Sequence, residues 1–355
     1  MTLEDFDYHL PPELIAQSGA EPRDTSRLMV IDRKTRRLEH RIFRDLPQYL
    51  RPGDVLVLNQ SKVIPARTFA TNPQGTQIEV LLVREIPTAE NKTPFFEGGG
   101  SQEAGPGRLW EALLKPAKRA KLGATLTFAE GLTARVEAVE ADGTRLLRFA
   151  GNVWDHLETI GKTPLPPYIH ASVDPARYQT VYAKIPGSVA APTAGLHFTP
   201  ELMAQVEQMG VAIHYVTLHV GPGTFKPVHD DPNQHLMHLE PYEVSSQTAE
   251  AVNRAKAEGR RVIAVGTTVV RTLETAYSPA VAGIKPGAGE TQLFIRPGFQ
   301  YNVLDALITN FHLPRSTLLM LVSAFMGHEL MKQAYQTAVG ERYRFYSLGD
   351  AMFIL

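Results

Sequence analysis

Apolar and polar residues alternate along residues 71–150, in short stretches that glycine, asparagine or aspartate separates. These stretches read TQIEVLLV, RLWEALL, ATLTF, TARVEAV and TRLLRF. An alternation of period two is typical of a strand with one buried face, and several short strands at this spacing are typical of a small antiparallel barrel or sandwich. The pattern therefore predicts a β domain over 71–150. Within it, the polar, glycine-rich segment Pro87–Gly107 predicts a long loop.

The remaining residues, 1–70 and 151–355, show apolar runs that lead through loops into helical patterns. Buried strands are predicted where apolar residues run together, at 28–31, 55–58, 211–220, 261–265 and 304–309. Helices are predicted at 200–209, 246–258, 269–277, 317–325 and 329–338. Alternation of this kind gives a sheet with helices on its faces, and ligands of such sheets bind at the loops beyond the strand ends. We therefore expect the motif-bearing loops to converge.

Two loops rich in small residues, 191–198 and 221–225, flank a predicted helix and strand, and a histidine accompanies each: His197 and His219. Small residues let the backbone come close to a ligand. Substrate-binding candidates in these loops are Thr193, Gly195, Phe198, Gly221, Gly223, Thr224 and Phe225. The glycine spacing of GPGTF does not fit a dinucleotide fingerprint, and a plain turn also explains it.

Two later loops lead into predicted helices and bring further polar groups. Gly266, Thr267 and Thr268 could present amides and hydroxyls to an anion or a ribose, although ordinary capping by threonine explains them equally well. The segment Asn310–Ser316 combines an amide, a ring, an imidazole and a hydroxyl in Asn310, Phe311, His312 and Ser316. A purely structural loop is the alternative for this segment. On the helix that follows Thr268, Arg271 and Glu274 are spaced for an intrahelical ion pair.

The segment His235–Glu240, HLMHLE, invites a metal-site interpretation that its pattern does not support. The order differs from HExxH, and Pro232 and Pro241 exclude a long helix, so we expect no metal here. We expect His238 and Glu240 to bind a polar ligand instead. A carboxylate suits the N–H donors on the Watson–Crick edge of a guanine-like base, and Asp350 could do the same.

Composition narrows the class of protein. The chain has 355 residues, no cysteine and a formal net charge of −1. The lack of cysteine excludes disulfides and thiolate zinc sites and favours a reducing cytoplasm. The N-terminus does not fit a signal peptide, and no apolar run is long enough to span a membrane. A net charge near zero argues against nucleic-acid binding over the whole surface, but it allows binding at a local basic patch.

Two groups of cations are candidates for RNA binding. Lys115, Lys118, Arg119 and Lys121 form the most basic stretch, which is either a solvated face or a patch that contacts an RNA backbone. Arg23 and Arg27 precede the first predicted strand and could contact an anion or RNA; a salt-bridged turn is the alternative.

Taken together, these motifs identify a family. The chain resembles, from end to end, the S-adenosylmethionine:tRNA ribosyltransferase-isomerases of queuosine biosynthesis. The matching segments are EPRDTSRLMVIDR, RPGDVLVLN, VIPAR, KPAKR, PLPPYI, RYQTVYA, APTAGLHFT, TLHVGPGTFKPV, HLMHLE, GTTVVRTLE, TNFHLPRSTLLMLVSAF and YRFYSLGDAMFI. The main departure is the insertion-like segment Pro87–Gly107, which touches no motif.

The resemblance implies a fold and an activity. The fold is α/β: a discontinuous large α/β domain, 1–70 and 151–355, with a small antiparallel β-barrel, 71–150, inserted into it. The activity transfers the ribosyl moiety of S-adenosylmethionine to the aminomethyl group of a 7-deazaguanine at the tRNA wobble position. Epoxyqueuosine forms, and adenine and methionine leave. S-adenosylmethionine is a co-substrate, no prosthetic group or metal is needed, and a monomer is favoured.

This chemistry suggests roles for the candidate residues. The sulfonium acidifies the adjacent C5′–H, so a neutral histidine can act as the base; His197, His219 and His312 are candidates for the base or for the acid that protonates adenine. Phe198, Phe225 and Phe311 could face the sulfonium, and Thr267, Thr268 and Ser316 could hold the ribose or the methionine ends. Two alternatives stay open, namely an RNA methyltransferase that uses S-adenosylmethionine and a non-catalytic RNA-binding protein.

Overall fold

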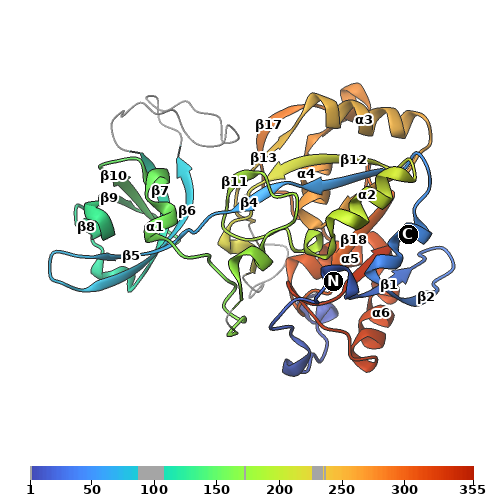
Figure 1. Cartoon of the computed structure of the whole chain (residues 1–355), viewed down its shortest axis with the longest axis horizontal. Helices are drawn as coiled ribbons and strands as arrows, with labels where there is room; N and C mark the ends of the chain where they lie inside the picture. The colour runs from blue at the N-terminus through green and yellow to red at the C-terminus, as the bar shows by residue number, and fades with distance from the viewer. Residues whose placement is uncertain (1, 87–107, 172, 226–234, 236) are drawn as a thin grey trace. The chain divides into compact units, whose positions relative to one another are not determined.

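The structure is a computed structural model, and it describes residues 2–86, 108–171, 173–225, 235 and 237–355. The chain forms two compact units (Figure 1). The first consists of Met1–Ser61, Pro167–Ala183 and Ala191–Leu355, and the second of Lys62–Pro166 and Lys184–Ala190. The boundaries predicted from the sequence, at 70 and 151, fall inside the second unit. The predicted loop Pro87–Gly107 lies outside the described residues.

The first unit is built on a nine-stranded mixed sheet. Its order is β17 (Gly287–Thr291), β13 (Glu240–Val244), β12 (Ala212–Leu218), β3 (Val55–Asn59), β14 (Val262–Val265), β18 (Ala306–Asn310), β19 (Ala351–Ile354), β1 (Arg27–Ile31) and β2 (Leu38–Ile42). The four strands β12, β3, β14 and β18 are parallel, so their carboxyl ends lie at one edge of the sheet. Strand β19 runs antiparallel to β18 and parallel to β1.

Helices cover both faces of this sheet. Successive residues of β3 point to opposite faces: Leu56 packs in a core with α2 (Pro200–Gln208), and Val57 packs in a core with the other helices. Those helices are α3 (Ser246–Ala257), α4 (Thr267–Ala276), α5 (Thr317–Met326) and α6 (His328–Gly340). Burial on both faces explains why β3, β14 and β18 read as continuous apolar runs.

The starts of the helices follow from their capping residues. Thr199, Ser245 and Ser316 each accept a backbone N–H of the helix that they precede, which confirms the predicted starts. Helix α4 begins at Thr267, two residues before the predicted start, because Gly266 supplies the positive φ of +94° at its N-terminus.

The second unit contains a closed antiparallel barrel, which confirms the predicted fold class. The barrel order is β10 (Arg145–Phe149), β7 (Leu109–Lys115), β6 (Gln77–Ile86), β5 (Arg67–Thr71), β8 (Thr125–Phe128) and β9 (Thr133–Val139). Alternate residues such as Ile78, Val80 and Leu82 fill its interior. The short helix α1 (Leu157–Ile160) follows the barrel, and β11 (Ile185–Ser188) pairs with β4 (Ser61–Val63).

A second pair of strands, β15 (Tyr277–Ser278) and β16 (Gly283–Ile284), forms a short ribbon after α4. Among the described residues, none of the helices is long and apolar enough to cross a membrane. The same residues contain no cluster of three or more histidine, aspartate or glutamate side chains that could hold a metal ion.

Candidate functional site

A pocket lies at the edge of the large sheet where the parallel strands end. It takes residues from the loop after Ala190, from the start of α4, from the end of β18 and from the turn before β19. The lining consists of Ala191, Pro192, Thr193, Ala194, Val220, Gly266, Thr267, Thr268, Thr309, Asn310, His312, Leu318, Tyr346 and Ser347. Loops far apart in the sequence thus meet here, as expected for ligand sites in sheets of this kind. We call this the strand-end pocket.

Gly266 and the two threonines shape one wall of this pocket. Gly266 has φ +94°, and a Cβ on it would lie 3.5 Å from the Cβ of Ala194. Asn59, at the end of β3, donates its side-chain amide to the Thr268 hydroxyl at 3.3 Å. Thr267 and Thr268 begin α4 and line the pocket. Helix capping by threonine is wrong, because the N-cap is Gly266 and no side chain caps this helix. Binding of an anion or a ribose by these residues stays a prediction.

His312 is the only one of the three candidate histidines that lines the strand-end pocket within the described residues. Its backbone is fixed on both sides: its N–H donates to the Tyr335 hydroxyl at 3.0 Å, and its carbonyl accepts the Tyr8 hydroxyl. Its Nε2 lies 3.0 Å from the Thr309 hydroxyl. Burial lowers the pKa of His312 to about 3, so its imidazole is neutral at physiological pH.

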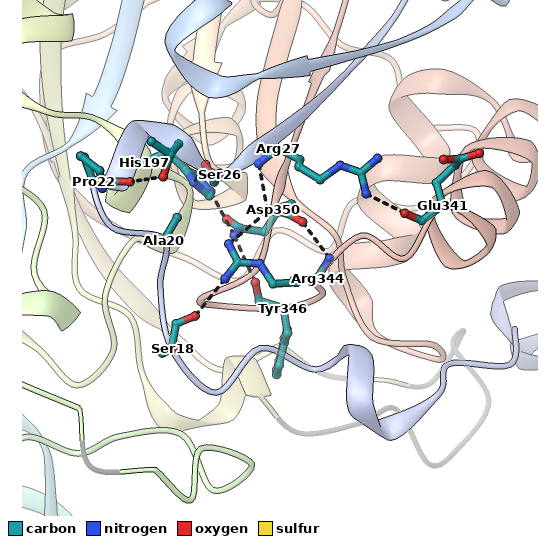
Figure 2. Close-up of polar contacts among 12 residues, drawn as sticks. Ser18, Ala20, Pro22, Ser26, Arg27, His197, Glu341, Arg344, Tyr346 and Asp350 are labelled. Carbon is teal, nitrogen blue, oxygen red and sulfur yellow. Dashed lines mark hydrogen bonds and ion pairs between the residues drawn. The ribbon is translucent and has the colours of Figure 1, made fainter.

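His197 lies behind the pocket instead of in its lining. Its Nδ1 is 2.7 Å from the Ser26 hydroxyl, and its Nε2 is 3.3 Å from the amide nitrogen of Asn310. Figure 2 shows Ser26 beside the imidazole. Its ring stacks on Phe43 at a centroid distance of 4.9 Å. Burial, with the charges of Arg344 and Arg23, lowers the pKa of His197 to about 3.

His219 follows β12 and is also buried. Its Nδ1 lies 2.8 Å from the Ser61 hydroxyl, and its backbone N–H donates to the Pro241 carbonyl. The adjacent Val220 lines the strand-end pocket, whereas His219 is not part of the described lining. His312 therefore lines the pocket itself. His197 is connected to the pocket through Asn310, and His219 is the residue before the pocket-lining Val220.

His238 and Glu240 line a separate small hollow with Gly223, His235, Met237 and Thr317. A Cβ on Gly223 would come within 2.0 Å of the His238 ring, so a larger residue here would require the exposed His238 side chain to move. Glu240 is buried, accepts the Gly221 N–H at 3.1 Å and pairs with Arg271. The side chains of Thr224 and Phe225 lie outside the described part of the chain.

The predicted ion pair between Arg271 and Glu274 is wrong. Arg271 reaches across to Glu240 on β13 and donates its Nε to the Leu293 carbonyl. Glu274 instead accepts the backbone N–H groups of Asn302, Val303 and Leu304. Both side chains are buried, so partners from other elements replace the exposed pairing that helix spacing suggested.

Asp350 is almost wholly buried and is surrounded by protein donors (Figure 2). One carboxylate oxygen accepts the Arg27 N–H at 3.0 Å and the Arg344 guanidinium at 3.2 Å. The other accepts the Arg344 N–H at 2.8 Å. These bonds hold the chain before β1 against the chain before β19, and a base-reading role for Asp350 would have to break them.

The arginines just before and at the start of β1 also make bonds inside the protein. Arg23 donates to the carbonyls of Gln179 and Ala176, at 2.8 Å and 2.9 Å. Arg27 donates to the Glu341 carbonyl at 2.6 Å and stacks over the Tyr343 ring. In the barrel unit, the predicted RNA-binding residues Lys115, Lys118, Arg119 and Lys121 are exposed, and none forms an ion pair with a described residue.

Several predicted substrate contacts belong to the core or to helix capping. The Phe198 and Phe311 rings are fully buried and pack against other aromatic side chains, so neither lines the strand-end pocket. Ser316 caps α5 and donates its hydroxyl to the Leu313 carbonyl. A Cβ on Gly195 would lie 1.9 Å from the Tyr182 hydroxyl, so this glycine serves packing.

Sequence reasoning missed four polar residues near the pocket: Ser26, Asn59, Tyr346 and Ser347. Ser26 and Asn59 bond to site residues, and the other two line the pocket. The Ser347 hydroxyl also meets the Tyr168 hydroxyl. Tyr346 has a positive φ of +74°, uncommon for a bulky residue. Their positions in the sequence could have identified them, because each residue lies at the end of a predicted strand or inside a segment that matches the family.

Comparisons with known proteins found similar chains. A family model described as "Queuosine biosynthesis protein" matches residues 3–354. A protein of Thermus thermophilus named S-adenosylmethionine:tRNA ribosyltransferase-isomerase is 59% identical over 99% of both chains. One of that name from Deinococcus radiodurans is 54% identical over 99% of this chain and 94% of its own. The crystal structure of an S-adenosylmethionine tRNA ribosyltransferase from Thermotoga maritima matches with a TM-score of 0.55 and 42% identity, covering 99% of this chain and 100% of that one.

Proposed function

Because this chain belongs to the queuosine biosynthesis protein family, we propose that it is an S-adenosylmethionine:tRNA ribosyltransferase-isomerase. It transfers the ribosyl moiety of S-adenosylmethionine to the aminomethyl group of 7-aminomethyl-7-deazaguanine at the tRNA wobble position. Epoxyqueuosine forms, and adenine and methionine are released. The observation that carries this proposal is the 59% identity to a relative of that name over nearly the whole of both chains.

The strand-end pocket is the proposed site for S-adenosylmethionine. Its lining combines apolar contacts with the hydroxyl-bearing side chains Thr193, Thr267, Thr268 and Thr309, which suit a ribose or the polar ends of the methionine. Phe225 was proposed to face the sulfonium, and this stays a proposal. The buried rings of Phe198 and Phe311 give that role no support.

We assign the base to His312. The positive sulfur makes the adjacent C5′–H acidic, so a weakly basic neutral imidazole suffices to remove the proton. His312 lines the pocket and is neutral because burial lowers its pKa to about 3. Both ring nitrogens of His197 already bond to Ser26 and Asn310, and His197 does not line the pocket, so His197 is the weaker candidate.

The tRNA is the second substrate. Exposed cations at Lys115, Lys118, Arg119 and Lys121 in the barrel unit are the proposed contacts to its backbone. His238 remains a proposed contact to the modified base. The same role for Glu240 would have to break its bonds to Gly221 and Arg271. We further propose that the protein acts as a monomer in the cytoplasm.

The products distinguish this function from its alternatives. The protein is mixed with S-adenosylmethionine and tRNA that carries the aminomethyl precursor, and the small molecules are separated by chromatography. The ribosyltransferase releases adenine and methionine in equal amounts. A methyltransferase would release S-adenosylhomocysteine, and a non-catalytic RNA-binding protein would leave S-adenosylmethionine intact while it binds the tRNA.

A further inference from the structure

Asn310 connects the strand-end pocket to a buried hydrogen-bond chain. It is the last residue of β18, it lines the pocket, and only 2% of its surface is exposed. Its side-chain nitrogen lies 3.1 Å from the Tyr346 carbonyl and 3.3 Å from the His197 Nε2. A buried amide with two fixed neighbours has little freedom to rotate.

The Tyr346 carbonyl determines which way the amide faces. A carbonyl oxygen can only accept a hydrogen bond, so the Asn310 atom next to it must be the NH₂ nitrogen. The same nitrogen therefore donates its second hydrogen to the His197 Nε2. An amide turned by 180° would place its oxygen against the Tyr346 carbonyl, where two acceptors would repel each other.

The amide in turn determines the tautomer of His197. Because Nε2 accepts from Asn310, the single proton of the neutral imidazole is on Nδ1 and is donated to the Ser26 hydroxyl at 2.7 Å. Stacking on Phe43 fixes the ring plane. Ser26, His197 and Asn310 thus form one ordered chain from the 3₁₀ turn before β1 to the pocket (Figure 2 shows Ser26, His197 and Tyr346).

The remaining atom of this chain is the Asn310 carbonyl oxygen, Oδ1. It is buried and has no hydrogen-bond partner among the described residues. The nitrogen side of the amide is held by Tyr346 and His197, so Oδ1 is the amide atom that a molecule in the pocket can reach. A buried oxygen without a donor is unfavourable, and a bound ligand that brings an N–H or O–H group removes that cost.

We propose that His197 is a positioning residue: its Nε2 accepts from the Asn310 amide, whose direction the Tyr346 carbonyl sets, and holds that amide in place so that Oδ1 accepts a hydrogen bond from an N–H or O–H group of the bound S-adenosylmethionine. This inference rests on the proposed function for the identity of the ligand. The groups of that ligand that can donate are its adenine amine, its ribose hydroxyls and its α-ammonium. The inference gives His197 a role in binding the ribosyl donor and leaves proton transfer to His312.

The orientation of the chain can be tested without any substrate. Long-range proton–nitrogen NMR of the imidazole nitrogens distinguishes the two neutral tautomers, and comparison with the His197→Gln variant identifies the His197 signals. We expect a protonated Nδ1 and an unprotonated Nε2 in the free protein. A protonated Nε2 would overturn the proposal, whatever reaction the protein catalyses.

The role in binding is tested with variants and with S-adenosylmethionine as the probe, by calorimetry. Asn310→Ala should weaken binding about 2- to 10-fold, the usual effect of one neutral hydrogen bond. His197→Leu, which removes the acceptor for the amide, should weaken binding by a similar factor. His197→Gln, whose side-chain oxygen can accept from Asn310, should restore most of the affinity and most of the turnover with an unchanged pH profile. His170→Gln, at an exposed position, is the matched control.

Analogues identify the ligand group. Analogues that lack the adenine amine, one ribose hydroxyl or the α-ammonium are compared on the wild-type protein and on Asn310→Ala. The analogue that lacks the group bound by Asn310 should bind the wild-type protein more weakly than S-adenosylmethionine does. On Asn310→Ala, that analogue and S-adenosylmethionine should bind equally well.

Other outcomes contradict the proposal. Loss of turnover in His197→Gln with normal S-adenosylmethionine binding would make His197 a proton-transfer residue. Equal losses on both proteins for every analogue would remove Asn310 as an acceptor. A wild-type protein that binds S-adenosylmethionine but releases no adenine would contradict the proposed function alone.

Discussion

At the scale of single residues, burial determines what each titratable group of the site can do. His197 and His312 are both enclosed, and burial lowers the pKa of each to about 3. Asp350 and Glu240 are equally buried but accept hydrogen bonds from guanidinium and backbone groups of the protein. The imidazoles therefore stay neutral, and the carboxylates serve as braces for the backbone.

The residue types could be predicted from the sequence, but their surroundings could not. The polar set Asn310–Ser316 indicated a site, and Asn310 and His312 indeed line the pocket, whereas His197 and His219, beside the loops rich in small residues, are not in its lining. Asp350 accepts the N–H of Arg27, 323 residues earlier, and the carboxylate of Glu240 meets Arg271, 31 residues later. Local patterns contain no information on such distant partners, so both side chains looked available for a ligand.

Replacement of His312 by glutamine tests the assignment of the base. A positioned general base contributes about 100- to 10,000-fold to rate, so His312→Gln should lower adenine release by a factor in that range. Its affinity for S-adenosylmethionine and for tRNA should change little, because the side chain keeps its size and polarity. Adenine release is followed by chromatography, with His170→Gln as the control. Wild-type rates in His312→Gln would exclude His312 as the base.

The two buried histidines also make stability depend on pH. Between pH 6.5 and about 3, each histidine binds a proton in the unfolded chain but not in the folded protein. The free energy of unfolding should therefore fall as pH falls below 6.5, with a slope of about 1.4 kcal/mol per pH unit for each histidine.

Urea unfolding at several pH values between 7 and 4.5 measures this dependence. Carboxylates also titrate in this range, so the comparison that matters is with His197→Gln and His312→Gln. In each variant, the free energy of unfolding should depend less steeply on pH, by the contribution of the one histidine that was replaced. Slopes equal to that of the wild type would mean that these imidazoles accept protons in the folded state.

At the scale of elements, the site depends on turns that only glycine can make. Gly349 precedes the buried Asp350, and a Cβ on it would lie 2.4 Å from the Arg344 carbonyl oxygen. Gly223 and Gly195 have similarly close neighbours. The neighbours of Gly349 are backbone atoms, which cannot move away easily, whereas the ring beside Gly223 belongs to an exposed histidine.

Gly349→Ala should lower the free energy of unfolding by about 1–3 kcal/mol, the usual cost of overpacking. Gly340→Ala is the matched control, because no heavy atom lies within 4 Å of its Cβ and it ends α6. That control should change stability by less than about 1 kcal/mol. Urea unfolding of both variants measures the difference, and equal stabilities would show that the Arg344 turn can adapt.

Elements were predictable where the sequence has a local cause for them. The caps at Thr199 and Ser316 and the apolar runs of β3 and β18 identify those elements directly. Strands β13 and β17 were missed, because prolines, glycines and charged residues break their apolar pattern. Their pairing along the edge of the sheet overrides weak local preference.

At the scale of the whole molecule, the pattern of apolar residues distinguishes a β domain from an α/β domain. A period of two predicted a small antiparallel barrel or sandwich, and runs that feed helices predicted the α/β unit. The structure contains a closed barrel and the α/β unit. The extent of the second unit was not evident, since it includes Lys184–Ala190, far from the barrel strands in sequence. No local pattern marks that segment as part of this unit.

The barrel unit supplies the test of RNA binding. Reversal of two exposed cations in Lys118→Glu/Arg119→Glu should weaken tRNA binding, because fewer counterions are released from the RNA backbone. The slope of log affinity against log salt should become shallower by about 1 for each phosphate that the variant no longer binds. Filter binding over a salt series measures both, with S-adenosylmethionine affinity as the control for folding. Unchanged tRNA affinity and slope would place the RNA-binding surface elsewhere.

The central claim is that a neutral imidazole removes a proton from the carbon next to the sulfonium. S-adenosylmethionine that carries deuterium at both C5′ positions, incubated with the protein and precursor tRNA, tests it most directly. If His312 is the base, deuterium from C5′ should pass into water as adenine is released. His312→Gln should suppress both the loss of deuterium and the release of adenine. Modified tRNA that retains both deuterium atoms would contradict it.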